Sequence, residues 1–268
     1  MPMKLPTPCA APGCPAVSHG RFCDKHRKQH WQEVEATQKS PAQRGYDAKW
    51  KAARAVFLLA HPRCVECRTN GHTTKATDVD HVIPHRGNEL LFWATENWQA
   101  LCRRHHRAKT MRDNARDAAL LYPLNIRPSA IPLTIIHGPS GSGKTTWVRQ
   151  QAVAGDIIID LDEIRAGLAG LPMYWAADKW LRPSLLRRNE LLMSLADRTA
   201  GKAWFIVGAP RRAEQWYWAT MLKPERVMVL NVPLEQCIER LRGDERRGLQ
   251  VGKHIKAAEN WWKVWATP

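Results

Sequence analysis

One stretch, Leu133-Thr-Ile-Ile-His-Gly138-Pro-Ser-Gly-Ser-Gly143-Lys144-Thr145, decides the fold of the second half of this 268-residue chain. An apolar run leads into a glycine-rich loop that ends in Gly-Lys-Thr, a pattern typical of a phosphate-binding loop between a strand and a helix. Backbone amides of such a loop bind phosphates, Lys144 reaches the terminal phosphates, and the Thr145 hydroxyl coordinates magnesium. We therefore predict binding of ATP or GTP together with Mg²⁺. The expected nucleotide-binding residues are Gly138, Pro139, Ser140, Gly141, Ser142, Gly143, Lys144, Thr145, Thr146 and Asp160.

The second half alternates apolar runs with helical stretches. The apolar runs fall at 133–137, 156–161, 203–208 and 226–231, and the helical stretches near 144–154, 183–199, 211–222 and 233–242. This alternation predicts parallel βαβ units, with helices on both faces of a mostly parallel sheet. Three prolines between Pro123 and Pro132 prevent a continuous helix. We therefore expect a linker at 121–132 and a P-loop, ATP-binding domain at 133–268.

Carboxylates follow the second predicted strand, in Ile157-Ile-Ile-Asp160-Leu-Asp162-Glu-Ile-Arg165. The strand at 203–208 lacks the acidic residue that usually ends it in motor ATPases. This arrangement resembles small P-loop phosphotransferases of the polynucleotide kinase, zeta-toxin and antibiotic kinase type. The resemblance implies that Asp162 orients or deprotonates the acceptor hydroxyl and that Arg165 holds an acceptor phosphate. Asp160 would either hold the ligands of the magnesium ion in place or act as the base instead of Asp162. The resemblance also implies a closing lid whose arginines neutralise the transferring phosphate; a solvated helix end is the alternative. The lid candidates are Arg240, Arg242, Arg246 and Arg247.

The first half contains two short pairs of metal-ligating residues. These pairs are Cys64-Val-Glu-Cys67 and Cys102-Arg-Arg-His105. Each pair can form a turn around one ion, and together they supply the four ligands of a tetrahedral zinc. They bracket the segment Asp80-His81-Val-Ile-Pro84, and Asn97 and His106 lie near the second pair. Clustering of a candidate base with candidate metal ligands is typical of functional sites.

Residues 46–112 resemble the HNH, or ββα-metal, endonucleases, particularly those encoded beside phage packaging genes. The stretch Leu91-Phe-Trp-Ala-Thr-Glu-Asn97-Trp-Gln-Ala-Leu-Cys102 matches that group closely. The resemblance implies that His81 is the general base that deprotonates water, and that Asp80 and His106 are ligands of Mg²⁺ or Mn²⁺. Asn97 would fix the loop that bears His81. The family more often has a cysteine where this chain has His105, but imidazole is an ordinary zinc ligand.

A structural zinc module that binds DNA and cuts nothing is the alternative interpretation of the first half. It would account for the zinc ligands but would leave Asp80, His81 and His106 unexplained. Basic residues around the motif are expected to contact DNA phosphates without reading sequence. These residues are Arg86, Arg103, Arg104, Arg107 and Lys109.

The first 30 residues are rich in Pro and Cys and show no apolar period of 2 or 3.6, which indicates a small module held by metal. Its four candidate ligands form a second structural zinc site. They are Cys9, Cys14, Cys23 and His26. We expect this zinc knuckle at 1–30, a polar linker at 31–45 and the nuclease domain at 46–120. A helix is predicted at 47–60 behind an Asp47 cap.

Charge favours a nucleic-acid partner. The chain carries a formal net charge of +16, of which residues 1–128 contribute +10 and residues 129–268 contribute +6. Such an excess attracts phosphate polyanions, so DNA should bind mainly to the first half. No stretch approaches the roughly 20 apolar residues that span a bilayer, and no apolar signal segment is present. We expect a cytoplasmic location and no membrane partner.

These patterns predict a multidomain α+β and α/β protein: a zinc-stabilised ββα-metal nuclease followed by a P-loop kinase-like domain. The leading hypothesis is a DNA endonuclease fused to a phosphotransferase, such as a polynucleotide 5′-hydroxyl kinase. In one alternative, the P-loop half is an ATPase or nucleotide sensor that gates cleavage. In another, the whole chain is a non-catalytic DNA-binding accessory of a phage packaging or defence complex. Packaging proteins are a further expected class of partner.

Overall fold

The structure, a computed structural model, describes residues 5–37, 45–114 and 118–266. These residues fall into two compact units, 1–55 and 56–268, which are described separately. In the first unit, β1 (Thr7–Pro8) pairs antiparallel with β2 (Val17–Ser18), and α1 (Asp24–Thr37) follows. α1 enters the stretch 31–45 that was predicted as a linker, because no Gly or Pro interrupts it between 24 and 37. Residues 38–44 of that stretch lie outside the described residues.

α2 (Ala48–Ala60) confirms the helix predicted at 47–60. The backbone N–H of Trp50 donates a hydrogen bond of 2.9 Å to the Asp47 carboxylate, so Asp47 caps the helix as expected. His61 and Pro62 follow its last residue.

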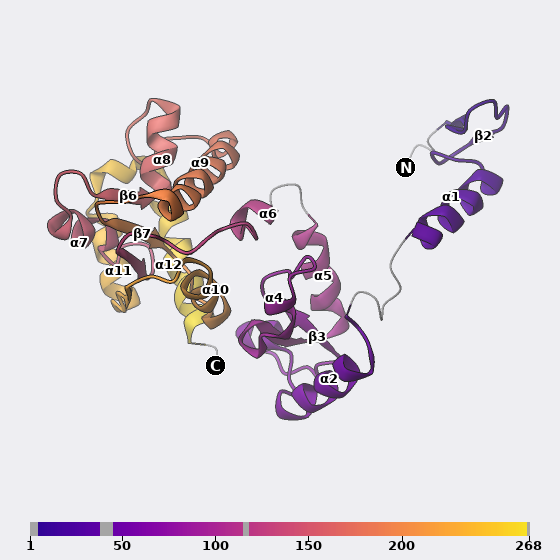
Figure 1. Cartoon of the computed structure of the whole chain (residues 1–268), viewed down its shortest axis with the longest axis horizontal. Coiled ribbons are helices and arrows are strands. Elements are labelled where there is room, and N and C mark those ends of the chain that lie inside the picture. The colour runs from indigo at the N-terminus through magenta and orange to yellow at the C-terminus, as the bar shows by residue number, and fades with distance from the viewer. Residues whose placement is uncertain (1–4, 38–44, 115–117, 267–268) are drawn as a thin grey trace. The chain divides into compact units, whose positions relative to one another are not determined.

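A ββα arrangement occupies the part of the second unit before residue 115 (Figure 1). β3 (Asp78–His81) and β4 (Trp98–Leu101) form an antiparallel hairpin, and α5 (Arg103–Asp113) follows directly. α3 (Val65–Thr69) precedes the hairpin, and α4 (Glu89–Trp93) and the 3-10 turn η2 (Thr95–Asn97) lie between its strands. The register pairs Asp80 with Gln99 and His81 with Trp98. Since side chains alternate along a strand, Asp80 and Gln99 project from one face and His81 and Trp98 from the other.

A parallel sheet in the order β6-β7-β5-β8 organises residues 118–266 (Figure 1). The strands are β5 (Leu133–His137), β6 (Ile157–Asp160), β7 (Ala203–Val207) and β8 (Arg226–Val229). The helices are α6 (Ala118–Leu121), α7 (Lys144–Gln151), α8 (Leu161–Ala169), α9 (Leu181–Ser194), α10 (Arg212–Leu222), α11 (Leu234–Arg242) and α12 (Val251–Trp265). The 3-10 turns are η3 (Asp178–Trp180), η4 (Leu195–Asp197) and η5 (Glu245–Gln250). All four predicted strands are present and all pair in parallel, which confirms the predicted fold class.

Alternation along the strands explains why helices cover both faces of the sheet. Ile135 and Phe205 contribute to one buried cluster with Leu192 of α9 and Trp218 of α10. Their neighbours along the strands face the other way, and Ile136 packs in a second cluster that includes α7. Burying both faces requires nearly continuous apolar strands, as this sequence has. No described helix is both long enough and apolar enough to cross a membrane.

Candidate active sites and metal centres

Four side chains from two segments converge beside the hairpin. Cys64 and Cys67 flank the start of α3, and Cys102 and His105 flank the start of α5. Cys67 Sγ lies 3.9 Å from Cys102 Sγ and 3.3 Å from His105 Nδ1. Cys64 Sγ and Cys102 Sγ are each 3.4 Å from the same nitrogen. Neighbouring ligands of a tetrahedral zinc are separated by about 3.5–3.8 Å, given Zn–S and Zn–N bonds of about 2.3 and 2.0 Å. This cluster could therefore hold zinc.

The N-terminal residues form a second such cluster. Cys23 Sγ lies 3.3 Å from His26 Nδ1 and 3.9 Å from Cys14 Sγ, and Cys9 Sγ lies 3.5 Å from His26 Nδ1. The Cys23 backbone N–H donates to Cys9 Sγ at 3.3 Å, and this bond, followed by a backbone hydrogen bond from Ala11, lowers the pKa of the Cys9 thiol to about 6. A thiolate is the form that binds metal. These four residues could also hold zinc.

Hydrogen bonds from a buried asparagine hold the segment that follows β3. Asn97 Oδ1 accepts from the backbone N–H of Ile83 at 2.8 Å, and Asn97 Nδ2 donates to the carbonyls of Ile83 and Leu91 at 2.9 and 3.0 Å. All of its polar atoms are thereby satisfied away from water, since the residue is fully buried. Asn97 thus connects the chain just beyond His81 to α4.

His81 lies at the end of β3 with its ring largely buried. Its Nε2 lies 2.9 Å from the carbonyl oxygen of Phe92. A carbonyl can only accept, so Nε2 carries the proton and Nδ1 carries the lone pair of the neutral ring. Burial lowers the pKa of His81 to about 4, so the ring is neutral at physiological pH. A neutral imidazole with this tautomer can accept a proton from water at Nδ1.

The Asp80 carboxylate is held by two neighbours on one oxygen. Its Oδ2 accepts from Gln99 Nε2 at 2.9 Å and lies 3.3 Å from Lys109 Nζ. Its other oxygen, Oδ1, lies 3.8 Å from His106 Nε2. An ion with bonds of about 2.1 Å to an oxygen and a nitrogen fits between atoms at this separation. Asp80 Oδ1 and His106 Nε2 could therefore share one divalent cation.

The prediction that Lys109 contacts DNA phosphate is wrong. Its side chain is only 6% exposed, and its ammonium group pairs with Asp80 and with Asp113. It therefore does not lie on the surface as a contact for DNA phosphate. Lys109 and Asp113 lie one turn apart on α5, so their side chains meet. Both lie on the same face of the helix as His106.

The glycine-rich loop between β5 and α7 has the backbone that its sequence predicts. Gly141 and Gly143 adopt φ values of 81° and 89°, which favour glycine. A Cβ on Gly141 would lie 2.6 Å from the carbonyl oxygen of Cys237, so no other residue fits. Lys144 Nζ donates to the carbonyls of Gly138 and Pro139 at 2.8 and 2.6 Å. Burial lowers the pKa of Lys144 to about 8, and a bound phosphate would restore its charged form.

The two aspartates after β6 have different environments. Asp160 Oδ2 accepts from Thr145 Oγ1 at 2.6 Å, and Asp160 Oδ1 accepts from the backbone N–H of Asp162 at 2.9 Å. Asp160 thus caps α8 and positions the hydroxyl that is expected to coordinate magnesium. Burial, and then the Asp160 charge, raise the pKa of Asp162 to about 6. A carboxyl group whose pKa is raised towards neutral pH can act as a general base.

The arginines predicted as a lid separate into different environments. Arg247 is buried, donates to Asp244 and to the Tyr174 hydroxyl at 3.0 Å each, and lies 3.9 Å from the Tyr174 ring centroid. Its charge acts on Asp162 and Lys144. Arg246 is paired with Asp244 in a largely exposed position, and Arg242 is exposed at the end of α11. Arg240 Nη1 lies 3.4 Å from the carbonyl oxygen of Ser142 in the glycine-rich loop. The structure therefore places Arg240 and Arg247, rather than Arg242, beside the nucleotide loop.

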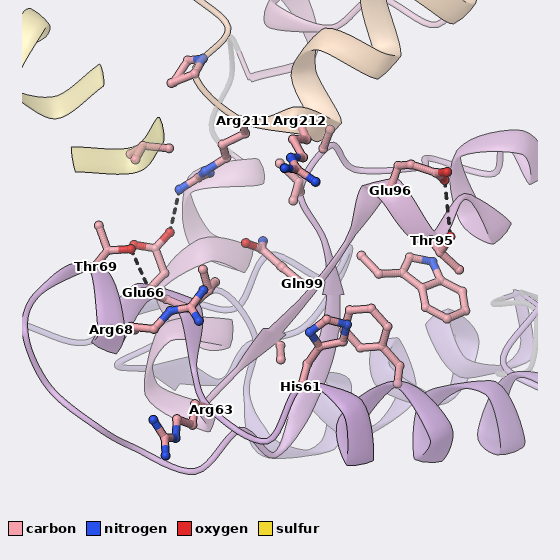
Figure 2. Close-up of a pocket in the computed structure, with 18 of the residues that line it drawn as sticks. His61, Arg63, Glu66, Arg68, Thr69, Thr95, Glu96, Gln99, Arg211 and Arg212 are labelled. Carbon is pink, nitrogen blue, oxygen red and sulfur yellow. Dashed lines mark hydrogen bonds and ion pairs between the residues drawn. The ribbon is translucent and has the colours of Figure 1, made fainter. Parts of the chain in front are cut away.

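A cavity of about 1270 Å³ opens in the second unit between the α3 segment and the start of α10 (Figure 2). Across it, Arg211 Nη2 donates to Glu66 Oε1 at 2.8 Å. Glu66 lies between Cys64 and Cys67, and Arg211 is the N-cap of α10. The sequence carried no signal for this pair, because the two residues are 145 positions apart.

Residues 64–112 match the family described as HNH endonuclease, and residues 133–264 match the family described as AAA domain. No curated protein matches the chain. Solved structures that resemble it include the HNH endonuclease of the deep-sea thermophilic bacteriophage GVE2 with manganese ion. That structure shows 25% identity and a TM-score of 0.26, and the match covers 35% of this chain and 98% of the phage protein.

Two further similar structures match about half of the chain. The shikimate kinase from Acinetobacter baumannii, in complex with shikimate, is 24% identical with a TM-score of 0.36, over 51% of this chain and 76% of the kinase. The tunicamycin resistance protein of Deinococcus radiodurans is 21% identical with a TM-score of 0.34, over 51% of this chain and 84% of that protein. Together with the geometry above, the family matches show an HNH nuclease domain followed by a P-loop kinase-like domain.

Proposed function

We propose that this protein is a metal-dependent DNA endonuclease joined to an ATP-dependent phosphotransferase. The 3.8 Å approach of Asp80 Oδ1 and His106 Nε2 carries the nuclease assignment, because it offers two candidate ligands for one cation, and the neutral base His81 directly follows Asp80 in the chain. The basic first half would bind DNA. Association with phage packaging proteins and a cytoplasmic location remain predictions.

Each side chain of the nuclease site has a separate task in the proposed reaction. His81 Nδ1 accepts the proton of the attacking water, while the bond to Phe92 fixes the ring. Asp80 Oδ1 and His106 Nε2 would hold Mg²⁺ or Mn²⁺, which supplies charge stabilisation to the phosphate and the leaving oxygen. Asn97 holds the segment after His81 in place through Ile83. Hydrolysis would leave a 5′-phosphate and a 3′-hydroxyl.

A plasmid assay tests the nuclease directly. The full chain is incubated with supercoiled plasmid and Mg²⁺ or Mn²⁺, and the expected result is relaxed or linear DNA that EDTA prevents. Intact plasmid under both ions would favour the non-catalytic accessory.

Gln99 provides a prediction about metal binding at this site. Because Gln99 Nε2 orients the Asp80 carboxylate, Gln99→Met should weaken Mn²⁺ binding about tenfold, the usual cost of losing a partner of a metal ligand. Electron paramagnetic resonance without DNA measures the binding constant, and the Mn²⁺ concentration for half-maximal cleavage should move equally. Gln150→Met, on the exposed side of α7, is the matched control. An unchanged Mn²⁺ constant in Gln99→Met would contradict the orienting role.

The second half is proposed to transfer the γ-phosphate of ATP to a hydroxyl. Lys144 and Thr145 would hold the phosphates and magnesium, Asp162 would accept the hydroxyl proton, and Arg247 would stabilise transferring charge. A polynucleotide 5′-hydroxyl end is the acceptor that the resemblance suggests. However, the proposed nuclease would leave 5′-phosphates, so its own products would not be substrates. Transfer of labelled γ-phosphate to a 5′-hydroxyl oligonucleotide tests this acceptor.

The ion pair between Glu66 and Arg211 favours a second candidate function, the gating of cleavage by nucleotide. Arg211 follows the loop after β7, and Gly208 of that loop accepts a hydrogen bond of 3.4 Å from the first glycine of the phosphate loop, Gly138. Glu66 lies in sequence between Cys64 and Cys67, two ligands of the candidate zinc cluster, and the last ligand of that cluster, His105, directly precedes His106. A change at the nucleotide could therefore reach the nuclease site through this pair.

The gating function predicts an effect of charge removal at Glu66. If ATP changes the rate of plasmid cleavage in the wild type, Glu66→Gln should reduce that change at least twofold while cleavage without ATP stays similar. The reason is that the pair couples the two sites without touching either reaction. Glu190→Gln, which removes an exposed pair with Arg187, should leave the ATP effect intact. Equal cleavage with and without ATP in the wild type would eliminate gating.

A further inference from the structure

The large cavity between α3 and the start of α10 has a mostly apolar wall. Its lining comes from α2, α3 and β4 of the HNH domain, and from α10 and the end of α12 in the P-loop domain. Phe57, Val264 and Trp265 are among the apolar side chains that face it. None of the lining residues is a zinc ligand, a proposed nuclease residue or part of the glycine-rich loop. The cavity therefore belongs to neither proposed reaction.

Two aromatic rings in this wall are supported from behind by other rings. Trp265 stacks on Trp261 with the ring centroids 4.9 Å apart and the planes 15° apart. Trp261 is buried, and its Nε1 donates to the carbonyl of Gly208 at 2.8 Å, so this support is fixed. The exposed ring of His61 lies 4.3 Å from that of Phe57. Because each supporting ring covers one face only, a planar base that enters the cavity can stack on the other face.

Arginines surround the apolar wall. Arg63 directly precedes the N-cap of α3 and Arg68 lies within that helix, whereas Arg211 and Arg212 begin α10 on the other side of the cavity (Figure 2). Arg211 is paired with Glu66 at 2.8 Å. The part of the chain that the structure describes gives no ion pair to Arg63, Arg68 or Arg212, and all three are exposed. Three guanidinium groups are thus available to an anionic ligand.

The charges and the size of the cavity fit a segment of a polyanion. Four arginines and two glutamates line it, a net charge of +2, and one of the glutamates is already paired. The other, Glu96, is exposed and accepts from Thr95 Oγ1 at 3.4 Å. The volume of about 1270 Å³ exceeds the roughly 300–1,000 Å³ of sites for drug-sized ligands. Several linked anionic groups fill such a space better than one small anion.

The apolar wall favours a single strand over a duplex. In a duplex the bases are paired and stacked on one another, so a protein meets phosphates and the edges of bases in the grooves. The faces of Trp265 and His61 would then have no partner. In a single strand the bases are free to stack on aromatic rings while the phosphates contact arginines, which is the usual composition of single-strand binding sites.

Gln99 places this cavity beside the proposed nuclease centre. Its side chain lines the cavity between the arginines of α3 and those of α10, and its Nε2 donates to Asp80 Oδ2 at 2.9 Å (Figure 2). A ligand in the cavity is therefore separated from the Asp80 carboxylate by a single side chain. Because that centre is proposed to act on DNA, DNA is the strand that the location favours.

We propose that the cavity between α3 and α10 binds a single strand of DNA, with phosphates at Arg63, Arg68 and Arg212 and a base stacked on Trp265. The site holds one strand next to the nuclease centre and uses no atom of either proposed reaction. The choice of DNA over RNA rests on the nuclease function given above. The binding of a single strand does not, because it needs neither a divalent cation nor cleavage.

Anisotropy of a labelled oligonucleotide tests the arginines. The full chain is titrated into a 5′-phosphorylated oligothymidylate of about eight nucleotides, within the size range of single-strand sites. No Mg²⁺ or Mn²⁺ is added, so the strand is not cut, and its 5′-phosphate prevents it from acting as a 5′-hydroxyl acceptor. Arg63→Gln, Arg68→Gln and Arg212→Gln should each weaken binding about fivefold at about 0.1 M salt and lower the salt slope by about 0.7, the value for one phosphate contact of a single strand.

Two further comparisons isolate stacking and position. Trp265→Leu should weaken binding about fivefold or more without a change in salt slope, and Trp265→Phe should retain most of the affinity because a phenyl ring still stacks. Arg226→Gln is the matched control, since Arg226 is exposed on β8 and does not line the cavity. Its affinity and salt slope should equal those of the wild type.

A duplex of the same length separates the single-strand site from general attraction to DNA. The cavity variants should bind the duplex within about twofold of the wild type. Equal weakening of duplex and single strand would overturn the proposal, as would unchanged single-strand affinity and salt slope in all three arginine variants. Tighter binding of an oligouridylate would overturn DNA as the strand. A dimer of the free chain that Trp265→Leu dissociates would assign the cavity to a second copy instead. Failure of plasmid cleavage would overturn the nuclease and leave these binding results unaffected.

Discussion

His81→Ala is expected to lower the rate of plasmid cleavage by about 10²–10⁴-fold, the usual contribution of a general base. The expectation follows from the bond to the Phe92 carbonyl, which places the proton on Nε2 and leaves Nδ1 as the basic nitrogen. Burial keeps the ring neutral, so it can accept a proton at physiological pH. Alanine removes this acceptor and leaves Asp80 and His106, so Mn²⁺ binding should persist. Cleavage rates at saturating Mn²⁺, with Mn²⁺ binding measured on the same preparation, give the comparison.

His72 supplies the matched control for this substitution. It is an exposed histidine in the same domain, so His72→Ala should cleave within about twofold of the wild type. If both variants cut as fast as the wild type, the base must be another group, and the role given to His81 is wrong. If His81→Ala also loses zinc, the loss of cleavage would report folding and not chemistry.

Cys67→Ser is expected to unfold the HNH domain and abolish cleavage. Structural zinc contributes about 10–16 kcal/mol of apparent binding free energy in small zinc-binding peptides, and here that energy would be folding energy. The ligands are part of the buried interior of this domain, since Cys64, Cys67 and Cys102 form a cluster with Leu101. Zinc content should fall from two ions per chain to one, because the N-terminal cluster stays intact. Metal analysis and limited proteolysis provide the measurements.

Cys237→Ser is the control for thiol loss. Its thiol lies outside both clusters and faces the carbonyl of Val232 at 3.4 Å, so zinc content and cleavage should match the wild type. The P-loop domain of Cys67→Ser should still bind ATP, since the apolar cluster that joins α7 to the sheet contains no residue of the HNH domain. Two zinc ions and normal protease resistance in Cys67→Ser would show that the cluster near α5 does not support the fold.

Local patterns predicted much of the fold. The spacing of Cys64 with Cys67, and of Cys102 with His105, predicted ligands that meet in space, because short ligand pairs leave few ways to fold around one ion. The four apolar runs predicted the parallel strands, since buried parallel strands are apolar throughout. The order β6-β7-β5-β8 did not follow from the sequence, because strand order depends on contacts between distant segments.

Contacts between distant segments also explain what the sequence left unpredicted at the sites. Gln99 orients Asp80 only because the hairpin register places the two opposite each other. Lys109 reads as a surface cation in a basic run, and only the position of α5 shows that it is buried against Asp80. Trp265 lies about 200 residues beyond Arg63, and only the packing of α12 brings both to the wall of one cavity. Pairs of this kind leave no periodic signal.

The central claim is that one chain carries two separate catalytic centres. The most direct measurement compares two variants of the full chain with the wild type in two assays. The assays are plasmid cleavage with Mn²⁺ and binding of a radiolabelled, non-hydrolysable ATP analogue with Mg²⁺. We predict that His81→Ala loses cleavage and keeps analogue binding, whereas Lys144→Ala loses analogue binding and, without nucleotide present, keeps cleavage. The claim would be contradicted if either variant lost both activities. It would also be contradicted if both variants kept both activities.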